Sequence, residues 1–169
     1  MTDTGTVEVG LSLGSNIGDK AAHIRAAVAA LGHDGLVTDI VGSSLYRTAP
    51  WGHVTEQDWF VNACICGHTK LPPTDLLAAC KAIEQRLGRT TTVRWGPRVI
   101  DIDILYYGDV ALRTPGLTIP HKDMLQRAFV LVPLAQIRPD KLIQGQRIKN
   151  AAAALEPTDV VALPEQSIT

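Results

Sequence analysis

Residues 7–13 read Val-Glu-Val-Gly-Leu-Ser-Leu and begin the series of elements from which the fold follows. Apolar residues alternate there with polar or small ones, and this period of two is typical of a strand with one buried face. The alternation ends at Gly14-Ser15-Asn16. Asp19 then fits a helix N-cap, because apolar residues recur after it at helical spacing and Gly32 can close the helix. These apolar residues are Ile24, Val28 and Leu31.

More strands and a second helix follow in a regular order. Residues 36–48, 60–69 and 99–107 are rich in β-branched, aromatic and other apolar residues, which predicts strands. A second helix is expected to open at residues 72–75 and to end at Gly88. Its apolar stripe consists of Leu76, Cys80, Ile83 and Leu87. The resulting split β-α-β repeat predicts an α+β, ferredoxin-like fold with both helices on one face of an antiparallel sheet.

The length of 169 residues suits a single domain. We expect its core to cover residues 7–139 and a loosely packed tail, residues 141–169, to be appended to it. Within the core, residues 123–137 predict a further helix that kinks or stops at Pro133.

The composition excludes several classes of protein. Lys and Arg number 16 against 17 Asp and Glu, so a formal net charge of −1 provides no general attraction to nucleic acid or anionic lipid. Three cysteines without a Cys-x-x-Cys pair indicate neither a disulfide framework nor a structural zinc site. The sequence has no recognisable signal peptide, and no apolar run approaches the roughly 20 residues of a membrane helix. We therefore expect a cytoplasmic monomer with small-molecule partners and no nucleic-acid or membrane partner.

Asp101-Ile102-Asp103-Ile104 is the motif with the clearest chemical implication. Side chains two residues apart in a strand point to one face, so both carboxylates project together, about 6–7 Å apart. The pair is costly to bury unless cations sit between the two acids, and Mg²⁺ is usually held by one or two carboxylates plus substrate phosphates. The apolar neighbours place this strand centrally in the sheet. Two acids that face water at a strand edge, or that pair with arginines, are the alternative.

Three arginines precede this motif: Arg89, Arg94 and Arg98, with Trp95-Gly96-Pro97 between the last two. The planar guanidinium binds phosphate oxygens in pairs and keeps its charge. A basic loop beside a metal-binding strand suits phosphoryl transfer, which depends mostly on positioning and charge neutralisation. Mutual neutralisation of the arginines and aspartates is the alternative.

Two further clusters carry polar groups. His121, in Thr118-Ile119-Pro120-His121, could donate to a phosphate or simply occupy a turn, whereas Arg127 in an apolar helix start requires an anion. Phe60 and Asn62 share a strand face, where a ring and an amide suit a flat heterocycle. A core Phe beside a hydrogen-bonded strand Asn explains them equally well. The Gly14-Ser15-Asn16 segment is not a phosphate-binding P-loop, because no Gly-Lys-Ser/Thr follows it.

Together these segments resemble one family, the 6-hydroxymethyl-dihydropterin pyrophosphokinases of folate biosynthesis. They occur in the family's order over most of the chain, and the Arg-Trp-Gly-Pro-Arg segment followed by Asp-x-Asp is highly specific. The matching segments are Leu13-Gly14-Ser15-Asn16, Tyr46-Arg47-Thr48, Phe60-Val61-Asn62, Glu84 with Gly88-Arg89, Arg94-Trp95-Gly96-Pro97-Arg98, Asp101-Ile102-Asp103-Ile104, Pro120-His121 and Arg127-Ala128-Phe129.

The resemblance implies transfer of an intact pyrophosphoryl group from ATP to the hydroxymethyl group of the pterin, with release of AMP. Asp101 and Asp103 would hold two magnesium ions, and Arg89 and Arg98 would act with them as catalytic residues. The residues implied for ATP binding are Leu77, Glu84, Arg89, Arg94, Trp95, Arg98, Ile104, Thr118, His121 and Arg127. The residues implied for pterin binding are Thr48, Ala49, Trp51, Phe60, Asn62, Trp95 and Phe129.

Several positions depart from the family pattern. Phe60 stands where some members have Tyr, and the loop around Thr91 is one residue shorter than in some relatives and lacks an additional arginine. Gly116 replaces an arginine of some members, and Lys122 follows the histidine where others carry Tyr or Pro. These departures leave open which cations assist catalysis. Two other functions also remain possible: a non-catalytic ferredoxin-like module that binds RNA or a regulatory nucleotide, and a kinase that transfers a single phosphate.

Overall fold

The computed structural model describes residues 5–33, 35–48, 59–88, 99–156 and 159–167. The strands of its main sheet are β1 (Val7–Ser15), β2 (Thr38–Gly42), β3 (Ser44–Thr48), β4 (Phe60–Thr69), β5 (Asp101–Tyr107) and β10 (Val160–Ser167). Two small hairpins are formed by β6 (Leu112–Thr114) with β7 (Leu117–Ile119) and by β8 (Leu142–Ile143) with β9 (Gln146–Arg147). The helices are α1 (Lys20–His33), α2 (Pro73–Arg86), α3 (Ala128–Ile137) and α4 (Ile148–Ala154), with a 3₁₀ turn at Met124–Gln126.

The main sheet is antiparallel and has the order β10-β3-β4-β1-β5, with β2 also paired to β4. Helices α1 and α2 cover one face, where Ile24, Leu31 and Ile83 pack against Leu11 and Ile102. The predicted antiparallel α+β fold, with these two helices on one face, is therefore confirmed. Among the described helices, none has the length and apolarity needed to cross a bilayer.

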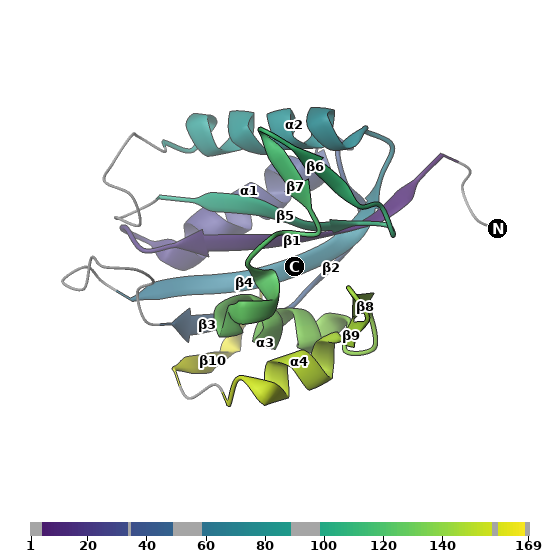
Figure 1. Cartoon of the computed structure of the whole chain (residues 1–169). Helices are drawn as coiled ribbons and strands as arrows, with labels where there is room; N and C mark the ends of the chain where they lie inside the picture. Colours follow the sequence, from purple (N-terminus) through teal and green to yellow (C-terminus); the bar gives the residue numbers. More distant parts are fainter. Residues whose placement is uncertain (1–4, 34, 49–58, 89–98, 157–158, 168–169) are drawn as a thin grey trace.

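Helices α3 and α4 form a third layer on the opposite face of the sheet (Figure 1). Val130 and Leu134 of α3 and Ile148 of α4 pack there against Cys64 and Tyr106 of the sheet. This second core covers only part of that face, so the remainder is left for polar side chains.

Two predicted elements are interrupted in the structure. The strand expected over residues 36–48 divides into β2 and β3 at Ser43, whose hydroxyl accepts a 3.0 Å hydrogen bond from the Cys64 N–H and donates one of 2.7 Å to the Ser44 carbonyl. The helix expected over residues 123–137 is a 3₁₀ turn followed by α3, which contains Pro133 without ending there.

Strand β5 lies at the end of the sheet order, which corrects the central position inferred from its apolar residues. Its outer edge is nevertheless occupied. Glu84 of α2 accepts a 2.7 Å hydrogen bond from the Ile102 N–H, and the His121 N–H donates one of 2.9 Å to the Leu105 carbonyl. These contacts satisfy backbone groups that an edge strand would otherwise expose, so an apolar strand is stable at this position.

The tail also differs from the expected loosely packed appendage. Ile148 and Ala151 of α4 are buried in the second core, and β10 pairs antiparallel with β3, placing Val160 opposite Thr48. Side-chain burial and strand pairing thus attach the tail to the sheet.

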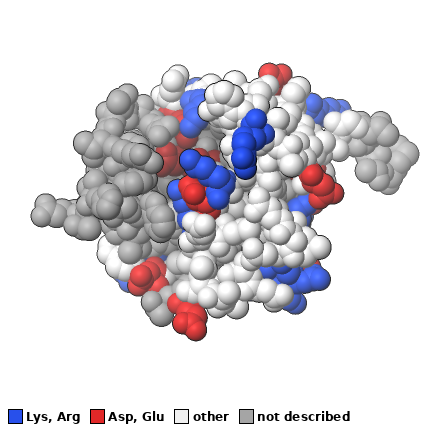
Figure 2. All heavy atoms as spheres, viewed as in Figure 1, with Lys and Arg blue, Asp and Glu red and all other residues white. Residues whose placement is uncertain are grey.

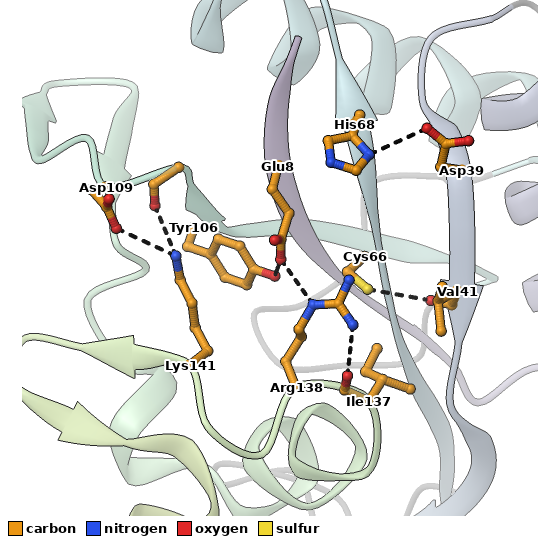
Figure 3. A network of polar contacts seen from close by, with 11 residues as sticks. Glu8, Asp39, Val41, Cys66, His68, Tyr106, Asp109, Ile137, Arg138 and Lys141 are labelled. Carbon is orange, nitrogen blue, oxygen red and sulfur yellow. Dashed lines mark hydrogen bonds and ion pairs between the residues drawn. The ribbon is translucent and has the colours of Figure 1, made fainter. Parts of the chain in front are cut away.

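A polar network ties the start of β1 to the segment that follows α3 (Figure 3). Glu8 Oε2 accepts hydrogen bonds from the Tyr106 hydroxyl at 2.5 Å and from Arg138 Nε at 3.0 Å. Lys141 Nζ lies 4.7 Å from the centroid of the Tyr106 ring. Burial acts to raise the pKa of Glu8, but the hydrogen bonds from Tyr106 and Arg138 and the charges of Arg138 and Lys141 outweigh it, so the pKa of Glu8 is lowered from its ordinary value of 4.5.

Because the folded-state pKa of Glu8 is lowered, its contribution to stability is present above pH 4.5 and is lost as the pH falls through the folded-state pKa. We expect Glu8→Gln to lower the free energy of unfolding by about 1 kcal/mol at pH 7 and to have little effect at pH 3. Urea denaturation at both pH values measures this difference. The exposed Asp159→Asn serves as the control, and an equal loss at both pH values for Glu8→Gln would contradict the charge-based explanation.

Candidate functional site

The side of the sheet that carries α3 and α4 also carries a row of polar residues, which we call the polar face. Gly14 of β1 is paired with Asn62 of β4 on one side and with Asp101 of β5 on the other. One rung further along, Ser12 is paired with Asp103. Cross-strand partners share a face, and the residues between them in sequence point into the core beneath α1 and α2. The polar face therefore carries an amide on β4 and two carboxylates on β5, the two strands that flank β1.

Asp101 and Asp103 occupy alternate positions of β5 and are both partly exposed, whereas Ile102 and Ile104 between and beyond them are buried in the main core. This alternation fixes both carboxylates on the polar face. No cluster of three or more metal-binding side chains occurs in the described part of the chain. Two carboxylates on one face fit a hard divalent cation whose remaining ligands are oxygens of water or of a bound phosphate.

A cavity of about 260 Å³ opens beside Asp103. It lies between α2, β5 and the segment from the β6–β7 hairpin to Lys122. Figure 2 shows basic and acidic side chains close together near the middle of the face that it draws. The residues that line the cavity are Leu77, Lys81, Ile102, Asp103, Ile104, Pro115, Gly116, Leu117, Thr118, His121 and Lys122.

Glu84 of α2 joins two residues that line this cavity, Ile102 and Lys81. Its side chain is 2% exposed, and its Oε2 accepts the hydrogen bond from the Ile102 N–H, at the residue between the two aspartates. Its Oε1 lies 3.4 Å from Lys81 Nζ on the preceding turn of α2. Glu84 thus holds β5 against α2 and orients Lys81 at the cavity wall.

His121 is oriented by its backbone and its ring. Its backbone N–H donates a hydrogen bond to the Leu105 carbonyl of β5. Its ring Nδ1 accepts a 3.1 Å hydrogen bond from the backbone N–H of Asp123. Burial lowers the pKa of His121, and the opposing charge of Asp103 does not reverse this shift. The imidazole is therefore neutral at pH 7 and carries its proton on Nε2, which is a hydrogen-bond donor.

Arg127 lies close by, at the start of α3. Its Nη2 is 3.3 Å from Asp123 Oδ2, and its guanidinium carbon lies 5.5 Å from the centroid of the Phe129 ring. Only 17% of its side chain is exposed. A partly buried guanidinium fixed in this way suits an anionic ligand.

The amide of the polar face is held on the other side of β1. Asn62 Nδ2 donates a 2.5 Å hydrogen bond to Thr48 Oγ1 on β3, and the two residues are 4% and 2% exposed. Phe60, the first residue of β4, is partly buried, as is Phe129. The Asn62 amide and the Phe60 ring therefore share one face, where a flat heterocycle could bind, and Phe129 packs against the second core on the same side of the sheet.

The structure brings together many of the predicted site residues. Around the cavity it places Leu77, Asp103, Ile104, Thr118 and His121, and Glu84 contacts the lining residues Lys81 and Ile102. Ala49, Trp51, Arg89, Arg94, Trp95 and Arg98 fall outside the described residues. Lys81 and Lys122 line the cavity and were not identified as site residues from the sequence. The position of Lys81, one helical turn after Leu77, was the available signal.

Comparisons with known proteins place the chain in a family. The family model described as 7,8-dihydro-6-hydroxymethylpterin-pyrophosphokinase (HPPK) matches residues 10–139. The 2-amino-4-hydroxy-6-hydroxymethyldihydropteridine pyrophosphokinase of Methylorubrum extorquens is 48% identical over 150 residues, which cover 89% of this chain and 94% of that protein. The Bacillus subtilis protein of the same name is 45% identical over 127 residues, or 75% of each chain.

Solved structures agree on the fold. The crystal structure of Plasmodium falciparum HPPK-DHPS with pteroate superposes with a TM-score of 0.71 at 16% identity, over 91% of this chain and 43% of the longer one. At this identity the likeness concerns the fold alone. The family match extends from β1 to the end of α3 and includes both aspartates, Asn62 and the cavity. The chain belongs to the 7,8-dihydro-6-hydroxymethylpterin-pyrophosphokinase family.

Proposed function

We propose that the polar face is the active site at which this chain transfers pyrophosphate from ATP to the hydroxymethyl group of 6-hydroxymethyl-7,8-dihydropterin. The products are AMP and the pterin diphosphate, an intermediate of folate biosynthesis. The observation that carries this assignment is the row Asn62, Gly14 and Asp101, which sets an amide suited to a heterocycle two strands from a carboxylate suited to a metal ion. A two-substrate transfer requires both groups on one surface.

Asp101 and Asp103 would hold magnesium, with two ions implied by the family resemblance. Bound Mg²⁺ neutralises charge on the triphosphate and polarises the oxygens that it contacts. The protein's part is to keep both carboxylates on one face, which the alternation of β5 and its pairing with β1 ensure. Fixing these charges before the substrates bind lowers the cost of reorganisation during the reaction.

The cavity beside Asp103 would receive ATP. Leu77 and Ile104 would form an apolar wall against the adenine base of ATP. Glu84 would stabilise this wall through its hydrogen bond with the Ile102 N–H. The Nε2–H of His121 and the guanidinium of Arg127 would donate to phosphate oxygens, because both are oriented by Asp123 near Asp103. Thr118 would add a polar contact from the hairpin, and Lys81 and Lys122 would add positive charge at the rim.

The pterin would bind on the Asn62 side of the polar face. The Asn62 carboxamide offers a donor and an acceptor to the edge of the ring, while Phe60 and Phe129 offer stacking surfaces. Thr48 would act through its hydrogen bond to Asn62. The family resemblance alone supports Ala49 and Trp51 as pterin-binding residues, Arg89, Arg94 and Arg98 as ATP-binding residues, and Trp95 as a contact to both substrates. Arg89 and Arg98 are proposed to be catalytic as well. A cytoplasmic location and a monomeric state are further proposals.

Product analysis tests the reaction class. Incubation of the protein with ATP, Mg²⁺ and the dihydropterin alcohol is expected to yield AMP and a pterin diphosphate, separable by ion-exchange chromatography. ADP as the product would identify a kinase that transfers a single phosphate. A protein that binds nucleotide without turning over would be a binding module.

Removal of one metal-binding carboxylate tests the metal assignment. We expect Asp103→Ala to lower kcat by about a thousandfold or more, because charge that develops on the phosphates loses its counterion, while the midpoint of thermal unfolding changes little. Asp109→Asn, whose carboxylate is fully exposed in the turn after β5, is the matched control. Near-normal turnover of Asp103→Ala with magnesium would show that Asp103 is not a metal ligand.

Removal of the amide tests the pterin assignment. We expect Asn62→Leu to raise the KM for the pterin roughly tenfold to a hundredfold, because the ring edge loses its hydrogen bonds, and to leave the KM for ATP unchanged. The exposed Asn150→Leu on α4 provides the same chemical change away from the site. Equal changes in both KM values would argue against a pterin-specific role for Asn62.

A further inference from the structure

Gly14 occupies the middle of the row that joins the two halves of the proposed site. Neighbouring strands lie about 4.8 Å apart, so Asn62 and Asp101, one strand away on either side, are about 10 Å from each other. Any side chain at position 14 would point from the polar face between the amide and the carboxylate. The segment Gly14-Ser15-Asn16 does not form a phosphate-binding loop, so its glycine requires another explanation.

The backbone conformation of Gly14 does not explain the glycine. Its φ lies outside the left-handed region that disfavours other residues, so an L-amino acid could adopt it without strain. The constraint comes from space. A Cβ atom at Gly14 would overlap the Asn62 Oδ1 atom and would lie 3.8 Å from Cδ1 of Phe60. The amide oxygen of Asn62 thus occupies the volume that a side chain at position 14 would require.

The carboxamide of Asn62 is consequently held at both ends. Nδ2 donates the 2.5 Å hydrogen bond to Thr48 Oγ1, and Oδ1 rests against Gly14. Asn62 is nearly inaccessible to solvent, so rotation of its amide would break a buried hydrogen bond. One N–H of the amide and the lone pairs of Oδ1 are left for a ligand.

We propose that Gly14 is a positioning residue for the pterin substrate. Because Gly14 has no side chain, the Asn62 amide oxygen can occupy the space beside the Gly14 Cα, and this contact holds the carboxamide in one orientation. The glycine also keeps any side chain at position 14 out of the span between Asn62 and Asp101, across which the hydroxymethyl group of a bound pterin would extend toward the two carboxylates of β5. This inference rests on the proposed function and adds a residue that does not itself donate to or accept from the substrate.

Gly14→Ala tests the proposal directly. The group that the new methyl meets is the end of a side chain rather than backbone, so we expect the fold to be retained and the Asn62 amide to be displaced. Loss of one buried hydrogen bond and of the amide orientation is expected to raise the KM and the Kd for the pterin roughly tenfold or more. The KM for ATP is expected to stay within about twofold, since the ATP cavity does not include Gly14.

Matched variants separate positioning from packing. Gly32→Ala, in the last turn of α1 on the other face of the sheet, introduces the same methyl with ordinary contacts and is the control for both substrates. Thr48→Val removes the hydroxyl that accepts the hydrogen bond from Asn62 Nδ2 and should raise the pterin KM. Thr48→Ser keeps a hydroxyl at this position and should leave the pterin KM close to that of the wild type. Because both changes act through Asn62, the double variant Gly14→Ala/Thr48→Val should lose little more than the worse single variant.

The results that would overturn the proposal are distinct from a failure of the proposed function. Wild-type protein that forms no AMP and binds no pterin would overturn both. An active wild type together with an unchanged pterin KM in Gly14→Ala would overturn the positioning role alone. So would a parallel rise of both KM values with a lowered midpoint of thermal unfolding, or full additivity of the Gly14 and Thr48 effects.

Discussion

Strand β1 is hydrogen-bonded along both edges, to β4 and to β5, and the site takes its geometry from this double pairing. The pairing fixes register, and in a strand a shift of one residue would exchange its two faces. Leu11 and Leu13 are held in the core beneath α1 and α2, so Ser12 and Gly14 must face the other way. Asn62 and Asp101 lie on this same face because the register pairs both of them with Gly14. The core and the polar face are therefore two results of one constraint.

Local sequence patterns predicted most elements because the side chains concerned have strong periodicity. The alternation in residues 7–13 and the stripe from Leu76 to Leu87 each specify one element and its buried face. The break at Ser43 was not predictable in this way, because it depends on a hydrogen bond with Cys64 on another strand. The edge position of β5 was also missed, because Glu84 and His121 cover that edge from segments distant in sequence.

The candidate site residues that the sequence could single out belong to motifs with an unusual chemical cost. Two carboxylates in an apolar strand, and an amide beside a ring, require a ligand or a partner, and this requirement is visible in the sequence. Gly14 carries no such signal, since its role lies in the space that it leaves for Asn62. Lys81 looked like an ordinary exposed helix residue, and only the hairpin opposite α2 makes it part of a cavity wall.

The family match ends at residue 139, yet β10 is part of the main sheet. Strand β10 is attached to β3 by backbone pairing, while Val161 and Ala162 along it are exposed. Backbone pairing places few demands on side-chain identity. Substitution of Val161 or Ala162 should therefore leave the pairing of β10 with β3 intact, whereas an insertion or deletion within β10 would shift the register of the strand and change which of its side chains face the core.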